Sequence, residues 1–334
     1  MWRGTEYSRC PSRNGVERYK FIPCPYTLAA PMDNRVNPFF SIIIPTYNRA
    51  GFIGATLESV LGQPFTDWET VVVDDGSTDN TAQVVAKFTD PRIHYLPKAN
   101  GERGAARNYG LARARGEYVI FLDSDDRLLP AHLATLHAQI QERSDPNFIA
   151  TKYNFDRDGM LVDSDLAGVA EGWYGLDFFV RGNALACNIC VRRANPGLHL
   201  FEEDRRYAAV EDWMFMLENT QQDRVYLVDA VTLTMNDHAA RSMRSDNTAL
   251  VRKLQLALAW MLARVALNPP QRRTLTGRVH YLCAIHAYAD NHRAQALRFA
   301  RLAAPKLPRV QAAVLLVRCL VGQSVVSWLK KVRA

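Results

Sequence analysis

Two acidic clusters and one polar tetrapeptide carry side chains suited to a phosphorylated ligand and a metal ion. Asp123 and Asp125 are separated by one residue, so a tight turn can direct both carboxylates to one point. Mg²⁺ is usually held by one or two carboxylates together with substrate phosphates, so this pair is enough for a hard divalent cation. The adjacent carboxylates Asp74 and Asp75 and the run Thr46-Tyr47-Asn48-Arg49 add further hydrogen-bonding groups.

Each polar group directly follows an apolar run of the kind that forms a strand buried on both faces. These runs are Phe40–Pro45, Thr70–Val73 and Tyr118–Leu122. Strand and helix alternate four times within about eighty residues, which predicts an α/β fold with a doubly wound, mostly parallel sheet. Ligands of such sheets bind outside the carboxyl ends of the strands, so we expect the three groups to converge on one crevice. The remaining expected elements are a strand at Arg92–Leu96 and helices at Phe52–Leu61, from Ser77 or Thr78 to about Phe88, and at Ala105–Arg115, the last closed by Gly116.

The pattern becomes less regular after residue 150. Short strands are expected at Phe148–Tyr153, Cys187–Arg192 and Val225–Val228, a helix from Glu211 to Leu217, and mostly helices from about Leu250. Cys187 and Cys190 form a C-x-x-C pair without a second pair at zinc spacing, so we interpret them as two small core residues.

Charge is distributed unevenly along the chain. We predict an irregular extension over residues 1–38, an α/β domain over 39–249 and a helical region over 250–334. Residues 39–251 have a net charge of −10, whereas residues 252–334 have a net charge of +14. An acidic body with basic ends is unlike a nucleic-acid-binding protein, whose basic patch lies on the folded face that binds, so we expect no nucleic-acid partner. This charge distribution instead suits a catalytic domain rich in carboxylates whose basic tail binds an anionic surface.

The composition, with 48% apolar and 22% charged residues, is that of an ordinary globular protein. The sequence has neither a recognisable signal segment nor an uninterrupted apolar run of membrane-spanning length, and its six cysteines fit reduced thiols. We therefore expect a cytoplasmic protein. An apolar stripe from Val310 to Trp328, followed by basic residues, predicts either a peripheral helix on the inner face of the membrane or a helix docked on the hairpin Tyr281–Ala303.

Four ordered motifs within residues 39–243 resemble those of the family 2 glycosyltransferases of GT-A fold. They are Ser41-Ile-Ile-Ile-Pro-Thr-Tyr-Asn-Arg49, Val73-Asp-Asp-Gly-Ser-Thr-Asp79, Gly104-Ala-Ala-Arg-Asn108 and Gly116-Glu-Tyr-Val-Ile-Phe-Leu-Asp-Ser-Asp-Asp126. The resemblance implies a catalytic domain that takes a nucleotide-diphosphate sugar, expected to be a UDP-sugar. It also implies Mg²⁺ or Mn²⁺ as cofactor, inversion at the anomeric carbon, and a saccharide or lipid-linked acceptor in surface polysaccharide or glycoconjugate biosynthesis.

The resemblance assigns roles to individual residues of the donor site. Tyr47 would stack on the nucleobase, and Asp75 would accept a hydrogen bond from it. Arg107 lies where the family approaches the nucleotide, although a solvated helix residue is an equally good interpretation of this arginine. The full set of implied nucleotide-sugar-binding residues is Pro45, Thr46, Tyr47, Asn48, Arg49, Asp74, Asp75, Arg107, Asp123 and Ser124.

The resemblance also assigns the metal and the catalytic base. Asp125 would bind the metal directly, with Asp123 beside it and His238 reaching the metal or the diphosphate, although the family's Tyr and Arg before this histidine are absent. Asp212 would take the proton of the acceptor hydroxyl, and Glu211 would orient it or the acceptor. The alternatives are that this acidic pair only favours a helix N-terminus, and that the protein is a catalytically inactive nucleotide-sugar-binding or scaffold protein of the same fold.

Overall fold

The structure, a computed structural model, describes residues 37–238 and 246–321 of the 334-residue chain. Most of the predicted N-terminal extension lies outside the described residues, and so does the part of the predicted apolar stripe and basic tail beyond Val321.

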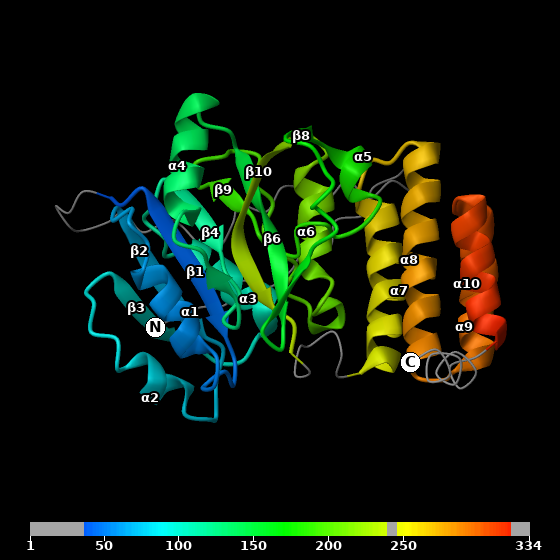
Figure 1. Cartoon of the computed structure of the whole chain (residues 1–334), viewed down its shortest axis with the longest axis horizontal. Coiled ribbons are helices and arrows are strands. Elements are labelled where there is room, and N and C mark those ends of the chain that lie inside the picture. Colours follow the sequence, from blue (N-terminus) through cyan, green and yellow to red (C-terminus); the bar gives the residue numbers. More distant parts are fainter. Residues whose placement is uncertain (1–36, 239–245, 322–334) are drawn as a thin grey trace, which may run out of the picture. The chain divides into compact units, whose positions relative to one another are not determined.

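Four parallel strands form the half of the sheet that was predicted from the apolar runs (Figure 1). They are β1 (Phe40–Thr46), β2 (Trp68–Asp74), β3 (Ile93–Pro97) and β4 (Tyr118–Phe121), in the order β3-β2-β1-β4. Every residue of β1 and β2 is buried, as expected for strands covered on both faces. Thr46 pairs with Asp74 at the end of the β1–β2 ladder, so the polar residues that follow the two strands leave the sheet at the same edge.

Beyond β4 the sheet becomes mixed. Strand β9 (Cys190–Arg192) runs antiparallel to both β4 and β6 (Phe148–Arg157), and β10 (Val225–Asn236) lies parallel to β6. Three short strands complete the sheet: β5 (Arg127–Leu128), β7 (Met160–Asp163) and β8 (Gly172–Tyr174). The predicted α/β fold class is confirmed, with the parallel strands around β1.

Two helices in the first half differ from the sequence prediction. The helices are α1 (Ile53–Leu61), α2 (Thr81–Val85), α3 (Glu102–Leu111) and α4 (His132–Glu142). Helix α2 is shorter than expected because Ser77 and Thr78 do not cap it; both instead bond Asn48, in the loop after β1. Helix α3 ends before Arg115, and Gly116 is not its cap. A Cβ at Gly116 would lie 2.4 Å from the Ser41 nitrogen, so this glycine permits close contact with β1.

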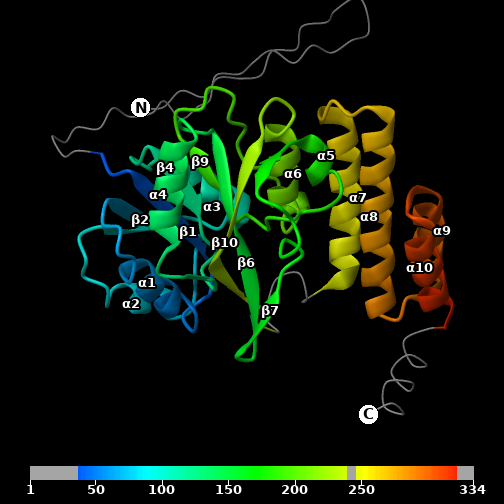
Figure 2. The same cartoon turned by 45° about the horizontal axis from the view of Figure 1, so that its top comes forward.

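The second half of the chain is largely helical. Its elements are α5 (Leu176–Phe179), η1 (Arg205–Tyr207), α6 (Glu211–Asn219), α7 (Asn247–Arg264), α8 (Pro269–Ala289), α9 (Arg293–Ala303), η2 (Ala304–Lys306) and α10 (Arg309–Val321). Figures 1 and 2 show α7 beside α8, and α9 beside α10. The Trp260 indole on α7 donates to Glu202 Oε2 at 3.0 Å, so α7 is tied to the residues before α6, and a domain boundary at residue 249 stays a prediction. None of the helices in the described ranges is both long and apolar enough to cross a membrane.

Candidate active site

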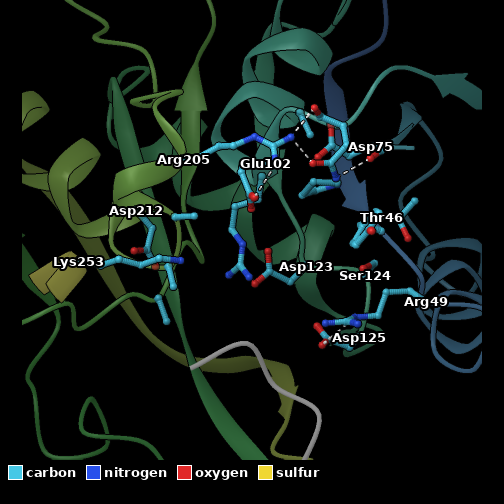
Figure 3. A pocket seen from close by; sticks show the side chains of 18 of the residues that line it. Thr46, Arg49, Asp75, Glu102, Asp123, Ser124, Asp125, Arg205, Asp212 and Lys253 are labelled. Atoms are coloured by element: carbon cyan, nitrogen blue, oxygen red, sulfur yellow. Dashed lines mark hydrogen bonds and ion pairs between the residues drawn. The ribbon is translucent and has the colours of Figure 1, made fainter. Parts of the chain in front are cut away.

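A pocket of about 530 Å³ lies where the predicted crevice was expected (Figure 3). This volume is in the range of roughly 300–1,000 Å³ that is usual for small-molecule sites. Residues at the end of β1 and after β1, β2 and β4 form one part of its wall, and residues of α3, η1, α6, α7 and the loops beside α3, α5 and α6 form the rest. The lining residues predicted from the sequence are Pro45, Thr46, Tyr47, Arg49, Asp75, Asp123, Ser124, Asp125 and Asp212.

The carboxylate of Asp75, a buried residue that lines the pocket, is held in a fixed orientation. Its Oδ1 accepts hydrogen bonds from Lys98 Nζ at 2.7 Å and from the Gly101 backbone at 2.8 Å. No donor among the described residues reaches Oδ2. Tyr47, which is 47% exposed, offers its ring to the same pocket. A pocket-lining carboxylate with one unpaired oxygen, together with an exposed aromatic ring, can bind a planar ring that carries an N–H donor.

Asn48 and Asp74 do not line the pocket but shape its loops. Asn48 has a positive φ of 51° and accepts a hydrogen bond from the Thr78 backbone at 2.8 Å. Asp74 is buried and accepts from the Ser77 backbone at 2.7 Å and from the Tyr95 hydroxyl at 2.5 Å. The Asn48 bond connects the loop after β1 to the loop after β2, whereas the Asp74 bonds hold the loop after β2 and join it to Tyr95 on β3, so both residues act on the pocket indirectly.

Three carboxylates after β4 could hold a metal ion. Ligand oxygens of Asp123, Asp125 and Asp126 all lie within 4.8 Å of one another, and oxygen donors are the ones that hard divalent cations prefer. Asp126 is buried and accepts from the Asn236 backbone at 3.0 Å, whereas Asp123 and Asp125 are partly exposed. Asp123 and Asp125 line the pocket, and this donor set fits Mg²⁺ or Mn²⁺.

His238 lies next to the acidic cluster but outside the pocket lining. Its Nε2 is 2.9 Å from Asp125 Oδ2, and its ring stacks on Phe52 with centroids 4.3 Å apart. Arg49 Nε lies 3.6 Å from the same carboxylate oxygen. Both side chains therefore act on the predicted metal ligand Asp125, and the histidine reaches it from the segment that follows β10.

Arg107 is neither a solvated residue nor part of the pocket wall. It is 1% exposed, and its guanidinium donates to Glu211 Oε1 at 2.8 Å and to Asp123 Oδ1 at 2.7 Å. The interpretation as a solvated helix residue was wrong, because partners 104 and 16 residues away in the chain hold the arginine buried, whereas its approach to the nucleotide stays a prediction. The arginine joins the acidic cluster after β4 to the start of α6 through one buried cation.

Asp212, in the first turn of α6, is held by two hydrogen bonds at the pocket wall. Asn183 Nδ2 donates to its Oδ2 at 2.7 Å, and the Trp213 backbone donates to its Oδ1 at 2.8 Å. Burial and the charge of Glu211 raise the pKa of Asp212 to about 6, although Arg107 acts in the opposite direction. Such a carboxylate is ionised at neutral pH and is a stronger base than an ordinary aspartate. Glu211 itself is buried behind the wall.

Several pocket residues were not predicted from the sequence. Arg205, in η1, bonds the Asn100 carbonyl at 2.7 Å and lies 3.6 Å from Glu102. Asn183 orients Asp212, and Lys253 reaches the pocket from α7. None of these positions follows an apolar strand, which was the signal that located the acidic clusters. Lys253 was counted only as part of the basic C-terminal region.

Comparisons with known proteins agree with this geometry. The model of the family described as glycosyl transferase family 2 matches residues 41–195. A putative teichuronic acid biosynthesis glycosyltransferase of Bacillus subtilis, TuaG, is 46% identical over 187 residues, which cover 54% of this chain and 73% of that protein. The glycosyltransferase GlyG of Streptococcus pneumoniae is 34% identical over 124 residues, which cover 36% of this chain and only 41% of GlyG.

Solved structures show the same fold. Residues 1–349 of Staphylococcus aureus TarS align with a TM-score of 0.61 at 22% identity, covering 81% of this chain and 82% of that one. A mannosyltransferase from Pyrobaculum calidifontis, solved with GDP-Man and Mn²⁺, aligns with a TM-score of 0.54 at 20% identity, covering 88% of this chain and 83% of that one. The match to TuaG, which covers most of that relative, shows that this chain belongs to the family 2 glycosyltransferases.

Proposed function

We propose that this protein is an inverting glycosyltransferase that moves a sugar from a UDP-sugar to a hydroxyl of a saccharide or lipid-linked acceptor in surface polysaccharide or glycoconjugate synthesis. The observation that carries the proposal is one pocket with two kinds of acidic group. Asp123 and Asp125 lie on one part of its wall, and Asp212, with its raised pKa, lies on another. Asp123 and Asp125 suit a metal-bound diphosphate, and Asp212 suits proton removal from a nucleophile.

The nucleotide would bind between Tyr47 and Asp75. The Tyr47 ring is free to stack on a base, and Asp75 Oδ2 can accept the N3–H of uracil. Pro45 and Thr46 supply backbone beside this position, with Arg49 and Ser124 further along the same wall. A TarS structure contains UDP-GlcNAc, which supports UDP as the nucleotide carrier.

The diphosphate would be neutralised at the acidic cluster. Asp125 and Asp123 would hold Mg²⁺ or Mn²⁺, which would supply positive charge to the leaving diphosphate. His238 and Arg49 keep Asp125 oriented, and Arg107 fixes Asp123 from behind. Without a cation these carboxylates would repel the diphosphate, so donor binding should depend on the metal.

Asp212 would act as the general base. It would accept the proton of the acceptor hydroxyl as that oxygen attacks the anomeric carbon on the face opposite the leaving diphosphate. Asn183 and the Trp213 backbone hold the carboxylate in one orientation, and Trp213 is itself anchored by a hydrogen bond of 2.8 Å from its indole to the Phe179 carbonyl. Glu211 positions Arg107 and raises the basicity of Asp212 by its charge.

Calorimetry with UDP and Mn²⁺, followed by a transfer assay, tests this proposal. Asp125→Asn should lose metal-dependent UDP affinity while keeping the wild-type circular dichroism spectrum. Asp212→Asn should keep UDP affinity but lose transfer by about 10²- to 10⁴-fold, because it cannot take the proton. UDP affinity that is equal with EDTA and with Mn²⁺ would contradict the metal assignment. Metal-dependent UDP binding without hydrolysis or transfer of any UDP-sugar would favour the inactive scaffold protein.

We further propose a cytoplasmic location with α10 as a peripheral membrane contact. Helix α10 packs through Ala312, Leu315 and Cys319, which are buried, whereas the valines of the predicted stripe remain exposed. Val310 is 77% exposed, and Val314 and Val317 are 61% and 57% exposed. Packing on the neighbouring helix therefore leaves the stripe available, and Arg309 and Arg318 on the same helix are suited to anionic lipid.

Liposome flotation with the full chain tests this contact. Replacing Val310, Val314 and Val317 together by Ser should abolish flotation on vesicles containing anionic lipid, because these exposed side chains would supply the insertion energy. Circular dichroism should stay unchanged, since the three positions are exposed. Wild-type protein that does not float, or a triple variant that floats equally well, would contradict the proposal.

A further inference from the structure

We infer that Lys253 binds a negatively charged group, a carboxylate or a phosphate, on the acceptor of this transferase. The inference rests on the proposed function and extends it to the chemical class of the acceptor. Lys253 is half-buried on α7 and lines the same pocket as Asp212. In Figure 3 these two side chains lie together on one side of the pocket, whereas Thr46, Arg49 and Asp125 lie on the opposite side.

Lys253 differs from the other basic side chains of the pocket in having no partner among the described residues. The other three that line the pocket are each paired with a carboxylate: Arg49 with Asp125, Arg103 with Glu211 and Arg205 with Glu102. A cation held half-buried loses part of its hydration, and this loss is compensated only when an anion arrives. Among the described basic side chains that line the pocket, Lys253 is therefore the one available to bind a ligand.

The position of Lys253 is fixed by a helix rather than by a loop. Helix α7 buries Leu250, Leu254 and Ala257 on the face next to this lysine, and the bond from Trp260 to Glu202 ties the same helix to the segment before α6. A side chain that starts from a packed helix loses less conformational freedom on binding than one on a mobile loop. Lys253 is thus placed as a recognition group, although its side chain has no partner within residues 37–238 and 246–321.

The position of Lys253 in the pocket indicates that the anion it binds belongs to the acceptor rather than to the donor. The donor diphosphate is assigned to Asp123 and Asp125 with their metal; Figure 3 shows Asp125 on the side of the pocket opposite Lys253 and Asp123 between them. Asp212, the carboxylate proposed to receive the acceptor proton, lines the pocket on the same side as Lys253 in Figure 3. Glu211 is already paired with Arg107 and Arg103, but an anionic acceptor would still be repelled by Asp212 unless another cation offset that charge. The Lys253 ammonium can supply this compensation and so favour charged acceptors over neutral ones.

Two pairs of probes test the inference on the full-length protein in the presence of UDP and Mn²⁺. One pair is p-nitrophenyl β-D-glucuronide and p-nitrophenyl β-D-glucoside, and the other is glycerol 3-phosphate and glycerol. Calorimetry should show about tenfold tighter binding of the charged member of at least one pair, the value of one charge-assisted hydrogen bond. The pair that shows the difference identifies the anion as a carboxylate or a phosphate.

Three variants assign this preference to the ammonium. Lys253→Met should remove it without changing UDP affinity, and Lys253→Arg should keep most of it. Arg252→Met is the matched control, because Arg252 is exposed on the same helix and does not line the pocket; it should behave as wild type. The inference is wrong if wild type does not discriminate within either pair, if discrimination survives in Lys253→Met, or if that variant instead loses UDP affinity.

Failure of the proposed function has a different signature, since it would abolish metal-dependent UDP binding in every variant, including wild type. The same probe pairs measured without UDP and Mn²⁺ would then still decide whether Lys253 binds an anion.

Discussion

Replacing Arg107 by Met should destabilise the protein far more than replacing an ordinary surface arginine. The arginine is 1% exposed, and it pairs with Glu211, whose side chain is 2% exposed, and with Asp123, whose side chain is 26% exposed. In the Met variant Asp123 can regain water, but Glu211 stays buried and loses its close cation, keeping only the longer contact of 3.8 Å with Arg103 Nε. Breaking a buried ion pair in this way costs about 3–5 kcal/mol. We expect a loss of about 3–4 kcal/mol because one of the two partners remains accessible.

Urea denaturation at neutral pH measures this loss as a lower transition midpoint at an unchanged slope. Arg113→Met is the control, since Arg113 is exposed, and it should change the unfolding free energy by less than about 1 kcal/mol. The double variant Arg107→Met with Glu211→Gln should recover about 2 kcal/mol of the loss, because no charge is then left buried alone. If Arg107→Met unfolds within 1 kcal/mol of wild type, or if Glu211→Gln brings no recovery, the buried pair does not stabilise the fold as argued.

Two further predictions concern Asp212 and Gly104. Because its pKa is raised to about 6, Asp212 becomes protonated as the pH falls through that value, so kcat/KM should drop about tenfold per unit below pH 6, and Asp212→Asn should lack this limb. The carboxyl group of Asp212 holds its proton more tightly in the native state than in the unfolded chain. The free energy of unfolding should therefore fall as the pH rises from 3.8 to about 6 and Asp212 ionises. Asp212→Asn avoids this loss, so it should melt at a higher temperature than wild type at pH 7. In Gly104→Ala the new Cβ would lie 2.3 Å from the Glu202 carbonyl oxygen, which should cost about 1–3 kcal/mol in urea denaturation. Gly54→Ala, whose Cβ would meet only Val84 at 3.6 Å, should be neutral or stabilising, and equal effects of the two substitutions would contradict the steric argument.

The parallel half of the fold could be predicted because its signals are local. The strands β1, β2 and β4 are continuous apolar runs, and each ends at a polar group that the structure places at one edge of the sheet. The antiparallel part was harder to predict. Strand β10 was expected to end at Val228, but it continues to Asn236 through a register shift between Val228 and Val231, where exposed Asp229 interrupts the apolar pattern. The C-x-x-C pair was interpreted as core, and both Cys187 and Cys190 are buried and free.

Arg107 could not be placed from the sequence because burial of a charge depends on partners that are distant in the chain. A helical arginine is usually solvated, and no pattern within α3 marks this one as buried. The anion that compensates it most completely, Glu211, is 104 residues away. The same reason hid Lys253, whose relation to Asp212 depends on how α7 packs against α6 and η1. Residues that depend on long-range electrostatic partners need the folded structure, whereas residues at strand ends do not.

The residues at strand ends and the residues on packed helices are proposed to serve different substrates in the pocket. The groups proposed for the donor follow β1, β2 and β4, so the strand register alone brings them together. The groups proposed for the acceptor, Asp212 and Lys253, come from helices whose relative placement depends on side-chain packing. Substitutions in the contact between α6 and α7 should therefore change acceptor preference while leaving donor affinity intact. Substitutions in the loops after β1 and β2 should do the reverse, because those loops contact only the nucleotide in the proposed arrangement. Acceptor specificity can thus change in such a pocket without loss of the donor chemistry.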